Sequence, residues 1–292
     1  MRKPRGFTLI EIVVVLAIVS LLLAMATFAT RAITIQQRIS TTATRLATVD
    51  AALVQFVMVQ KRLPCPANGT LPSSDPNAGS EDPASRTDAA GCTTNQQNGV
   101  VPWKAIGLSE NDATDGWLRR ITYRVDATLA GAGAMDMSGC DPAGTGTTSG
   151  GTLRLCLTTC TAGIVATSPT SCTAPLSFLQ GDGTPKGLTV QTLAGTKVMD
   201  PSATPTPTGA AYVLISHGES GGGAYLNTGN LASSTSTDGT EEQKNYANLP
   251  LAGYYVDDSI SDVPGATHFD DMLSHPTILT VISKAALAPR SH

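Results

Sequence analysis

The N-terminal segment leaves this chain few ways to fold, because it is apolar and contains no helix breaker. From Leu9 to Ala29 the only ionisable side chain is Glu11, and neither glycine nor proline occurs between Phe7 and Leu63. A continuous helix of about 55 residues would be roughly 80 Å long, and about 20 apolar residues suffice to cross the hydrocarbon core of a bilayer. The sequence therefore predicts a helix over residues 7–62, of which residues 7–29 cross a membrane.

Glu11 is unusual in such a segment, because a carboxylate within an apolar membrane helix costs about 2.5 kcal/mol or more and usually persists for a function. Arg2, Lys3 and Arg5 precede it, and the positive-inside rule places them in the cytoplasm and the bulk of the chain across the membrane. A secretory signal would also begin with basic residues, and residues 24–26 could be its cleavage site. An ordinary signal and a plain anchor therefore remain alternatives.

The string Gly6-Phe7-Thr8-Leu9-Ile10-Glu11 follows a short basic leader and precedes an uncharged helix. It resembles the class III signal of type IV pilins and type II secretion pseudopilins. In that family a prepilin peptidase cuts after the glycine, here Gly6, and methylates the new N-terminus, here Phe7. The resemblance implies that residues 1–6 are a leader peptide and that Glu11 pairs with the freed amine of a neighbouring subunit. Opposite charges attract strongly in a low-dielectric layer, so such a pair would fix the register of the subunits.

The same resemblance implies a function and a location. We expect a structural subunit, a large minor pilin or pseudopilin, that joins other pilins in a type IV pilus or a type II secretion pseudopilus. It would be a single-pass inner-membrane protein with a periplasmic C-terminal domain. The alternative, from a binding class, is an adhesin or DNA-uptake receptor displayed on a pilus. The net charge of -4 disfavours nucleic acid as a partner, and we expect neither a cofactor nor enzymatic activity.

Residues 63–292 are expected to form a β-rich globular domain against the second half of the helix. Apolar residues recur there at steps of three and four, which predicts a helix face packed on a sheet: Ile39, Ala43, Leu46, Val49, Leu53, Phe56 and Val57. Strands are expected at Ile121–Val125, Leu153–Leu157, Leu188–Leu193, Tyr212–Ser216, Tyr254–Val256 and Ile278–Ile282. The expected fold is α+β, a long N-terminal helix on an antiparallel β-sheet with long disulfide-crosslinked loops.

Two tryptophans follow the first loop. Trp103 and Trp117 are expected in the core, and a sugar-binding platform is the functional alternative.

All six cysteines lie beyond the apolar segment, at Cys65, Cys92, Cys140, Cys156, Cys160 and Cys172. An even number of cysteines in an exported domain indicates disulfides. We expect Cys65 to pair with Cys92 and the other four to pair among themselves. Zinc is the alternative ligand, since the spacing of Cys156 and Cys160 is tolerable for a metal site, but no histidine lies near them in the sequence.

A glycine-rich segment after the strand expected at Tyr212–Ser216 could carry hydrolase chemistry. Residues 218–222 fit the nucleophile-elbow pattern G-x-S-x-G, with Ser220 as the nucleophile and His217 beside it. The elbow requires a helix directly after the serine, and the sequence there indicates turns. A membrane-anchored serine hydrolase is therefore a remote alternative.

Acidic residues late in the chain could hold calcium through hard oxygen ligands. The weak candidates are Asp257, Asp258 and Asp262, followed by Asp270 and Asp271. No spacing among them matches a known calcium loop, so solvated turns are the simpler interpretation. His268 and His275 are expected at the surface.

Overall fold

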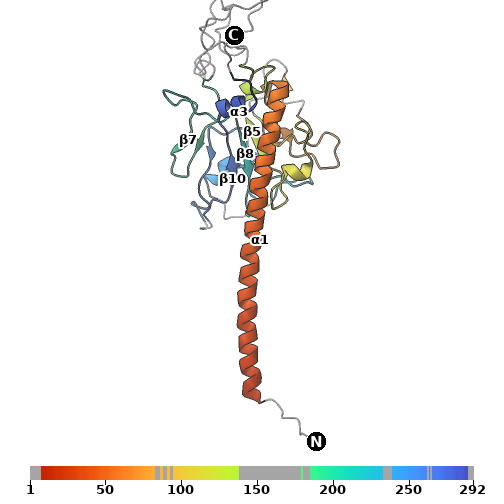
Figure 1. The fold of residues 1–292 in the computed structure, drawn as a ribbon, viewed down its shortest axis with the longest axis vertical. Coiled ribbons are helices and arrows are strands. Elements are labelled where there is room, and N and C mark those ends of the chain that lie inside the picture. Colours follow the sequence, from red (N-terminus) through yellow and green to blue (C-terminus); the bar gives the residue numbers. More distant parts are fainter. Residues whose placement is uncertain are drawn as a thin grey trace, which may run out of the picture.

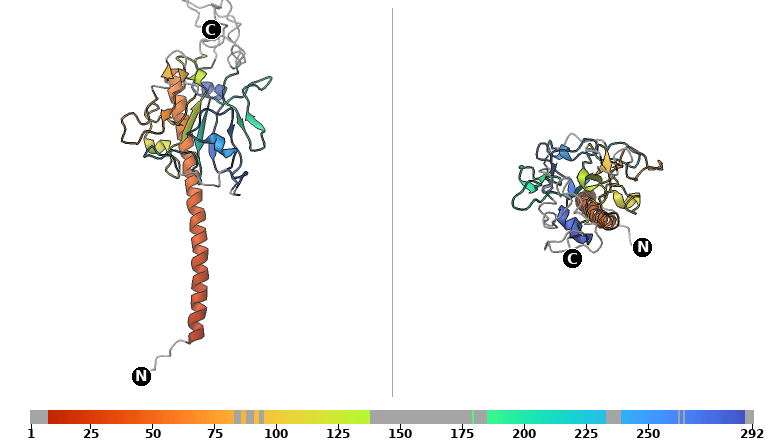
Figure 2. Two further views of the ribbon diagram at one scale, coloured as in Figure 1. Left: turned by 180° about the vertical axis from the view of Figure 1, so that it is seen from behind. Right: turned by 90° about the horizontal axis from the view of Figure 1, so that it is seen from above.

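The structure is a computed structural model, and it describes residues 8–82, 86–87, 91–92, 95–137, 179, 185–232, 239–261, 263 and 265–288. Helix α1 (Leu9–Gln60) is one continuous rod. The globular domain is built around its C-terminal half, and the N-terminal half projects beyond the domain (Figures 1 and 2). The predicted long helix is confirmed to within two residues at each end.

Helix α1 ends where the backbone of Lys61 turns left-handed, with a φ of 57°. The Lys61 N–H still reaches the Val57 carbonyl at 2.7 Å, which closes the last turn. Pro64 follows three residues later and disfavours any continuation of the helix.

The C-terminal half of α1 contacts the domain through one face. Leu46, Val49, Leu53 and Val57 are buried at steps of three and four, as the sequence predicts. Of the other predicted positions, Ile39 and Phe56 are half-buried, whereas Ala43 is exposed and Thr42 is buried in its place. The Thr42 hydroxyl accepts the N–H of Gly116 at 2.9 Å, so a polar contact begins the packed face.

The main sheet has five strands in the order β1-β4-β5-β8-β10, and every adjacent pair is antiparallel. The strands are β1 (Ala67–Asn68), β4 (Gly99–Val100), β5 (Thr122–Val125), β8 (Tyr212–Ser216) and β10 (Met272–Ser274). Tyr123 lies opposite Leu214, and Leu214 lies opposite Ser274, which sets the register at the centre of the sheet.

Strand β8 is buried on both faces, which explains its unbroken apolar run. Tyr212 and Leu214 join the core under α1, whereas Val213 and Ile215 face a second cluster with Val190. That second cluster belongs to a three-stranded sheet of β7 (Lys197–Met199), β6 (Val190–Gln191) and β9 (Tyr255–Val256), in which β6 and β9 are parallel. The domain therefore has three layers, and the sequence analysis anticipated only two of them.

Residues Ile278–Lys284 form helix α3, so the strand predicted at Ile278–Ile282 is wrong. Thr277 caps the helix by accepting the Thr280 N–H at 3.2 Å. Ile278, Val281 and Ile282 are buried at helical spacing, in the same core as α1. A short apolar run fits a strand or a buried helix equally well, and the cap decides between them here.

The remaining elements are short. A hairpin of β2 (Arg86–Thr87) and β3 (Gly91–Cys92) lies in the loop between β1 and β4. The 3-10 helices are η1 (Glu110–Ala113), η2 (Ala127–Leu129) and η4 (Glu242–Asn245). The predicted Cys65–Cys92 disulfide is present, with a Cα–Cα distance of 5.6 Å. The strand predicted at Leu153–Leu157 lies outside the described residues.

The two tryptophans differ in burial. Trp103 is a core residue, and the Arg120 guanidinium covers its ring at 5.0 Å, which leaves no face for a sugar. Trp117 is half-buried.

Leu53 is fully buried on α1, so Leu53→Ala should lower the free energy of unfolding by about 2–5 kcal/mol. The matched control is Met58→Ala, because Met58 lies on the same helix and is 49% exposed; it should change stability by less than about 0.5 kcal/mol. Urea unfolding of the chain in detergent, followed by tryptophan fluorescence, measures both. Equal losses in the two variants would mean that the packed face of α1 is assigned incorrectly.

Candidate functional site

Helix α1 begins with a capping box made by Thr8 and Glu11. Thr8 is extended, and its hydroxyl oxygen accepts the Glu11 N–H at 3.4 Å. Glu11 Oε2 in turn accepts the Thr8 main-chain N–H at 2.8 Å and the Thr8 hydroxyl at 2.9 Å. The S/T-x-x-E spacing of such a box is readable in the sequence, so the role of Thr8 could have been predicted.

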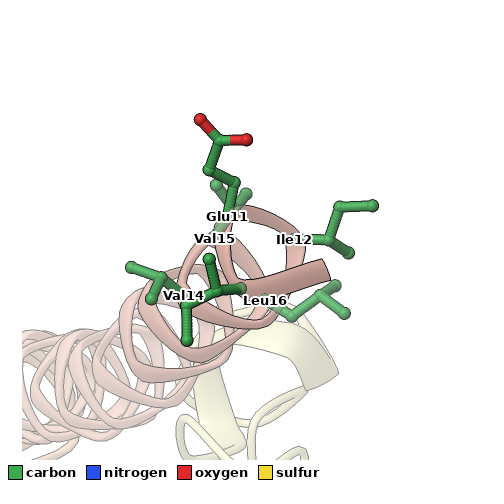
Figure 3. Close-up of a pocket in the computed structure, with 6 residues that line it drawn as sticks. Glu11, Ile12, Val14, Val15 and Leu16 are labelled. Carbon is green, nitrogen blue, oxygen red and sulfur yellow. The ribbon is translucent and has the colours of Figure 1, made fainter. Parts of the chain in front are cut away.

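The capping box occupies only one oxygen of the Glu11 carboxylate. Both bonds end on Oε2, and within the described residues no hydrogen bond reaches Oε1 and no cation pairs with this side chain. Glu11 is exposed, and Figure 3 shows it pointing away from the helix. The box therefore anchors the carboxylate without neutralising it.

Apolar side chains surround this carboxylate on the helix surface. The neighbouring side chains of this part of the helix are all apolar: Ile10, Ile12, Val14, Val15 and Leu16. Figure 3 shows Ile12 and Val14 on opposite sides of the helix, with Glu11 between them. The large apolar side chains from Leu9 to Leu23 are all exposed, with fractions between 44% at Val19 and 82% at Leu9. A soluble protein rarely exposes a continuous apolar surface of this kind, so the rod requires an apolar environment.

Among the residues whose structure is described, one helical segment, Thr30–Gln60, is long and apolar enough to cross a membrane, and Leu9–Leu23 is a shorter apolar segment of the same helix. The apolar helix fits membrane anchoring.

The other predicted site residues fall into two groups. The first group lies outside the described residues and consists of Gly6, Phe7, Cys140, Cys156, Cys160, Cys172 and Asp262. Asp257 accepts a bond from His275 Nε2 at 2.8 Å, while Asp258 accepts the Leu193 N–H at 2.9 Å. Neither aspartate belongs to a group of three or more metal-ligating side chains in the part of the chain that the structure describes.

The serine of the G-x-S-x-G pattern contacts an acid rather than a base. Ser220 donates its hydroxyl to Asp270 Oδ1 at 2.9 Å and its N–H to Asp270 Oδ2 at 2.6 Å. His217 turns away, and its Nε2 contacts the Thr122 hydroxyl at 2.8 Å in the buried interior. No helix directly follows Ser220, since residues 221–232 form turns and isolated bridges. Of His217, the Ser220 hydroxyl reaches only the main-chain carbonyl, at 3.5 Å, so the contact between serine and imidazole that a serine–histidine triad requires is missing.

Three residues expected at the surface are buried. Asp270 and His268 are each 8% exposed and Asp271 is 3% exposed, so their assignment to solvated turns and the surface is wrong. The acids are buried because other segments bring them donors: Asp271, for example, accepts the Asn245 amide at 2.8 Å.

Comparison with known proteins gives one finding on the N-terminal segment. Residues 1–27 match the family model described as the prokaryotic N-terminal methylation motif. No curated protein and no solved structure matches the chain. The matched range contains Gly6, Phe7 and Glu11, so the prepilin-type signature is present, and the matched range does not extend into the globular domain.

The burial of His217 makes the stability of the folded protein fall as the pH is lowered. Burial, together with the charges of Arg119 and Arg124, lowers the pKa of His217 from 6.5 to about 3. Between those pH values the unfolded chain binds a proton that the folded chain excludes. Stability should therefore be complete above about pH 6.5 and fall on acidification, by up to about 1.4 kcal/mol per pH unit.

Denaturant unfolding of the wild type and of His217→Gln at pH 7, 6, 5 and 4.5 measures this dependence. Carboxylates titrate in both proteins, so the difference between the two curves isolates the histidine. Parallel curves would contradict the assigned shift.

Proposed function

From the prepilin-type signature, we propose that this chain is cut by a prepilin peptidase and becomes a structural subunit of a type IV pilus or a type II secretion pseudopilus. Cleavage follows Gly6, and the new N-terminus at Phe7 is methylated. The observation that supports this proposal best is Glu11, a carboxylate whose Oε1 has no partner within the described residues and which lies on an apolar rod.

The membrane segment in this proposal is the N-terminal half of α1. Thr30–Gln60 is also long and apolar enough to cross a membrane, but 33% of its most apolar stretch is buried in the domain. That part already has a partner in the sheet. The side chains of Leu9–Leu23 are exposed throughout and contain one charge, so this half, continued to residue 29, is the part that enters the inner membrane. The domain is then periplasmic.

The capping box offers a second explanation for Glu11, and the two explanations differ in what they require. A cap needs only an acceptor at the third helical position, which glutamine also provides. Pairing with the freed amine of a neighbouring subunit needs the negative charge, and that attraction is strong because water is scarce in the membrane. A neutral acceptor would suffice to cap the helix, so the presence of the charged Glu11 at this position favours pairing with the amine of a neighbouring subunit.

The size of the domain supports a minor subunit. Long loops extend from a sheet of short strands; one of them, residues 69–98, separates β1 from β4. Such loops in every copy of a packed shaft would crowd the neighbouring subunits. A subunit that is present in few copies, near the tip of a filament, would have room for such loops.

Replacing Glu11 with glutamine should reduce incorporation into filaments at least about tenfold while leaving membrane insertion and processing intact. Removing one partner of a buried ion pair costs about 3–5 kcal/mol, and each 1.4 kcal/mol is a factor of ten. Immunoblots of sheared filaments, normalised to the membrane pool in cells that express the assembly system, measure the loss.

Two controls separate charge from capping. Thr8→Val removes the cap and keeps the charge, and Ser20→Ala removes another polar side chain of the apolar stretch. Both should assemble within about twofold of the wild type. Glutamine keeps the cap, so normal incorporation of Glu11→Gln would show that assembly does not need the charge of Glu11 and would contradict the proposal.

A further inference from the structure

Two segments of the domain bring three metal-ligating side chains together at a buried point. Glu242 lies at the start of η4, and His268 and Asp270 lie just before β10. Their exposed fractions are 1%, 8% and 8%, and one ligand atom from each lies within 4.8 Å of the other two. The three residues are named here the Glu242 cluster.

Main-chain donors fix the side chains of the Glu242 cluster. Glu242 Oε1 accepts the Asp270 N–H at 2.9 Å, and Oε2 accepts the Gly239 N–H at 3.0 Å. The Asp270 carboxylate is held by Ser220, through its N–H and its hydroxyl. His268 Nδ1 lies 2.8 Å from Glu242 Oε2. Such outer bonds orient ligands in metal sites and prepare them for an ion.

The charge of the Glu242 cluster calls for a cation. Among the described residues neither carboxylate forms an ion pair with lysine or arginine. Two neighbouring carboxylates removed from water are costly unless a positive charge accompanies them.

We propose that Glu242, His268 and Asp270 bind one divalent transition-metal ion of the zinc class. Two carboxylates and a neutral imidazole give a ligand charge that a divalent ion cancels. The imidazole favours zinc over calcium and magnesium, which take oxygen ligands. Zinc binds nitrogen and oxygen at about 2.0–2.2 Å, and at the tetrahedral angle two such ligands lie about 3.3–3.6 Å apart. The ligand atoms of the Glu242 cluster, which lie within 4.8 Å of one another, would therefore move together by up to about 1.3 Å when the ion binds.

Binding replaces one hydrogen bond of the Glu242 cluster. His268 Nδ1 would give its lone pair to the metal instead of a proton to Glu242, and the imidazole would carry its proton on Nε2. The ion would tie η4 and the turn before β10 to the glycine-rich loop through Ser220. This site is far along the chain from Glu11 and does not depend on the proposed function.

Metal analysis of the full chain in detergent tests the proposal. After a chelator removes bound metal, the wild type is incubated with zinc chloride, passed over a desalting column and assayed by mass spectrometry of the elements. We expect one zinc per chain. The midpoint of thermal unfolding should rise by about 5 °C or more when zinc is present at about 100 times its dissociation constant, and neither calcium nor magnesium should reproduce this rise.

The chain contains a matched control for the variants. His275 and Asp257 form a second histidine–carboxylate pair at 2.8 Å, outside the Glu242 cluster. His268→Gln and Asp270→Asn should lose the zinc and the thermal shift, whereas His275→Gln and Asp257→Asn should keep both.

The wild-type measurements decide the matter even where a variant fails to fold. No retained zinc and no zinc-dependent shift would overturn the proposal and leave a hydrogen-bonded network with a shared proton. An equal shift with calcium, or full zinc retention in folded His268→Gln, would also overturn it.

Discussion

One helix lies in two environments, and the rest of the structure depends on that division. The C-terminal half of α1 buries Leu46, Val49, Leu53 and Val57 against the sheet, and the apolar side chains of Leu9–Leu23 in the N-terminal half are exposed. No glycine or proline separates the two halves, so they form one rigid unit. Whatever covers the N-terminal half therefore sets the position of the whole domain (Figure 1).

Polar contacts complete the junction between α1 and the sheet. The Asp50 carboxylate accepts the Tyr212 hydroxyl at 3.0 Å from β8 and the Ser274 hydroxyl at 2.6 Å from β10. Arg45 donates to the carbonyls of Thr114 and Asp115 at 3.1 and 2.8 Å. Apolar packing alone would tolerate rotation or sliding of the helix, whereas these bonds require specific partners. They fix the direction in which the apolar half leaves the domain.

The sequence predicts features whose signal is local. The length of α1 follows from the absence of breakers, strand β8 from its apolar run, and the Cys65–Cys92 bridge from the loop that it closes. Features that depend on distant partners are not predictable in this way. The second sheet pairs Val190 with Tyr255, and the Glu242 cluster joins residues 26 and 28 positions apart. Helix α3 is an intermediate case, since its Thr277 cap is visible in the sequence but its apolar run also fits a strand.

The central claim is that the apolar half of α1 starts the mature protein and carries a charged carboxylate close to a freed amine. Mass spectrometry of the N-terminal peptide, from protein isolated from membranes that contain the peptidase, tests this claim most directly. The account predicts a first residue of Phe7 with a methylated amine. A chain that starts near Thr27, or one that retains Met1, would contradict it.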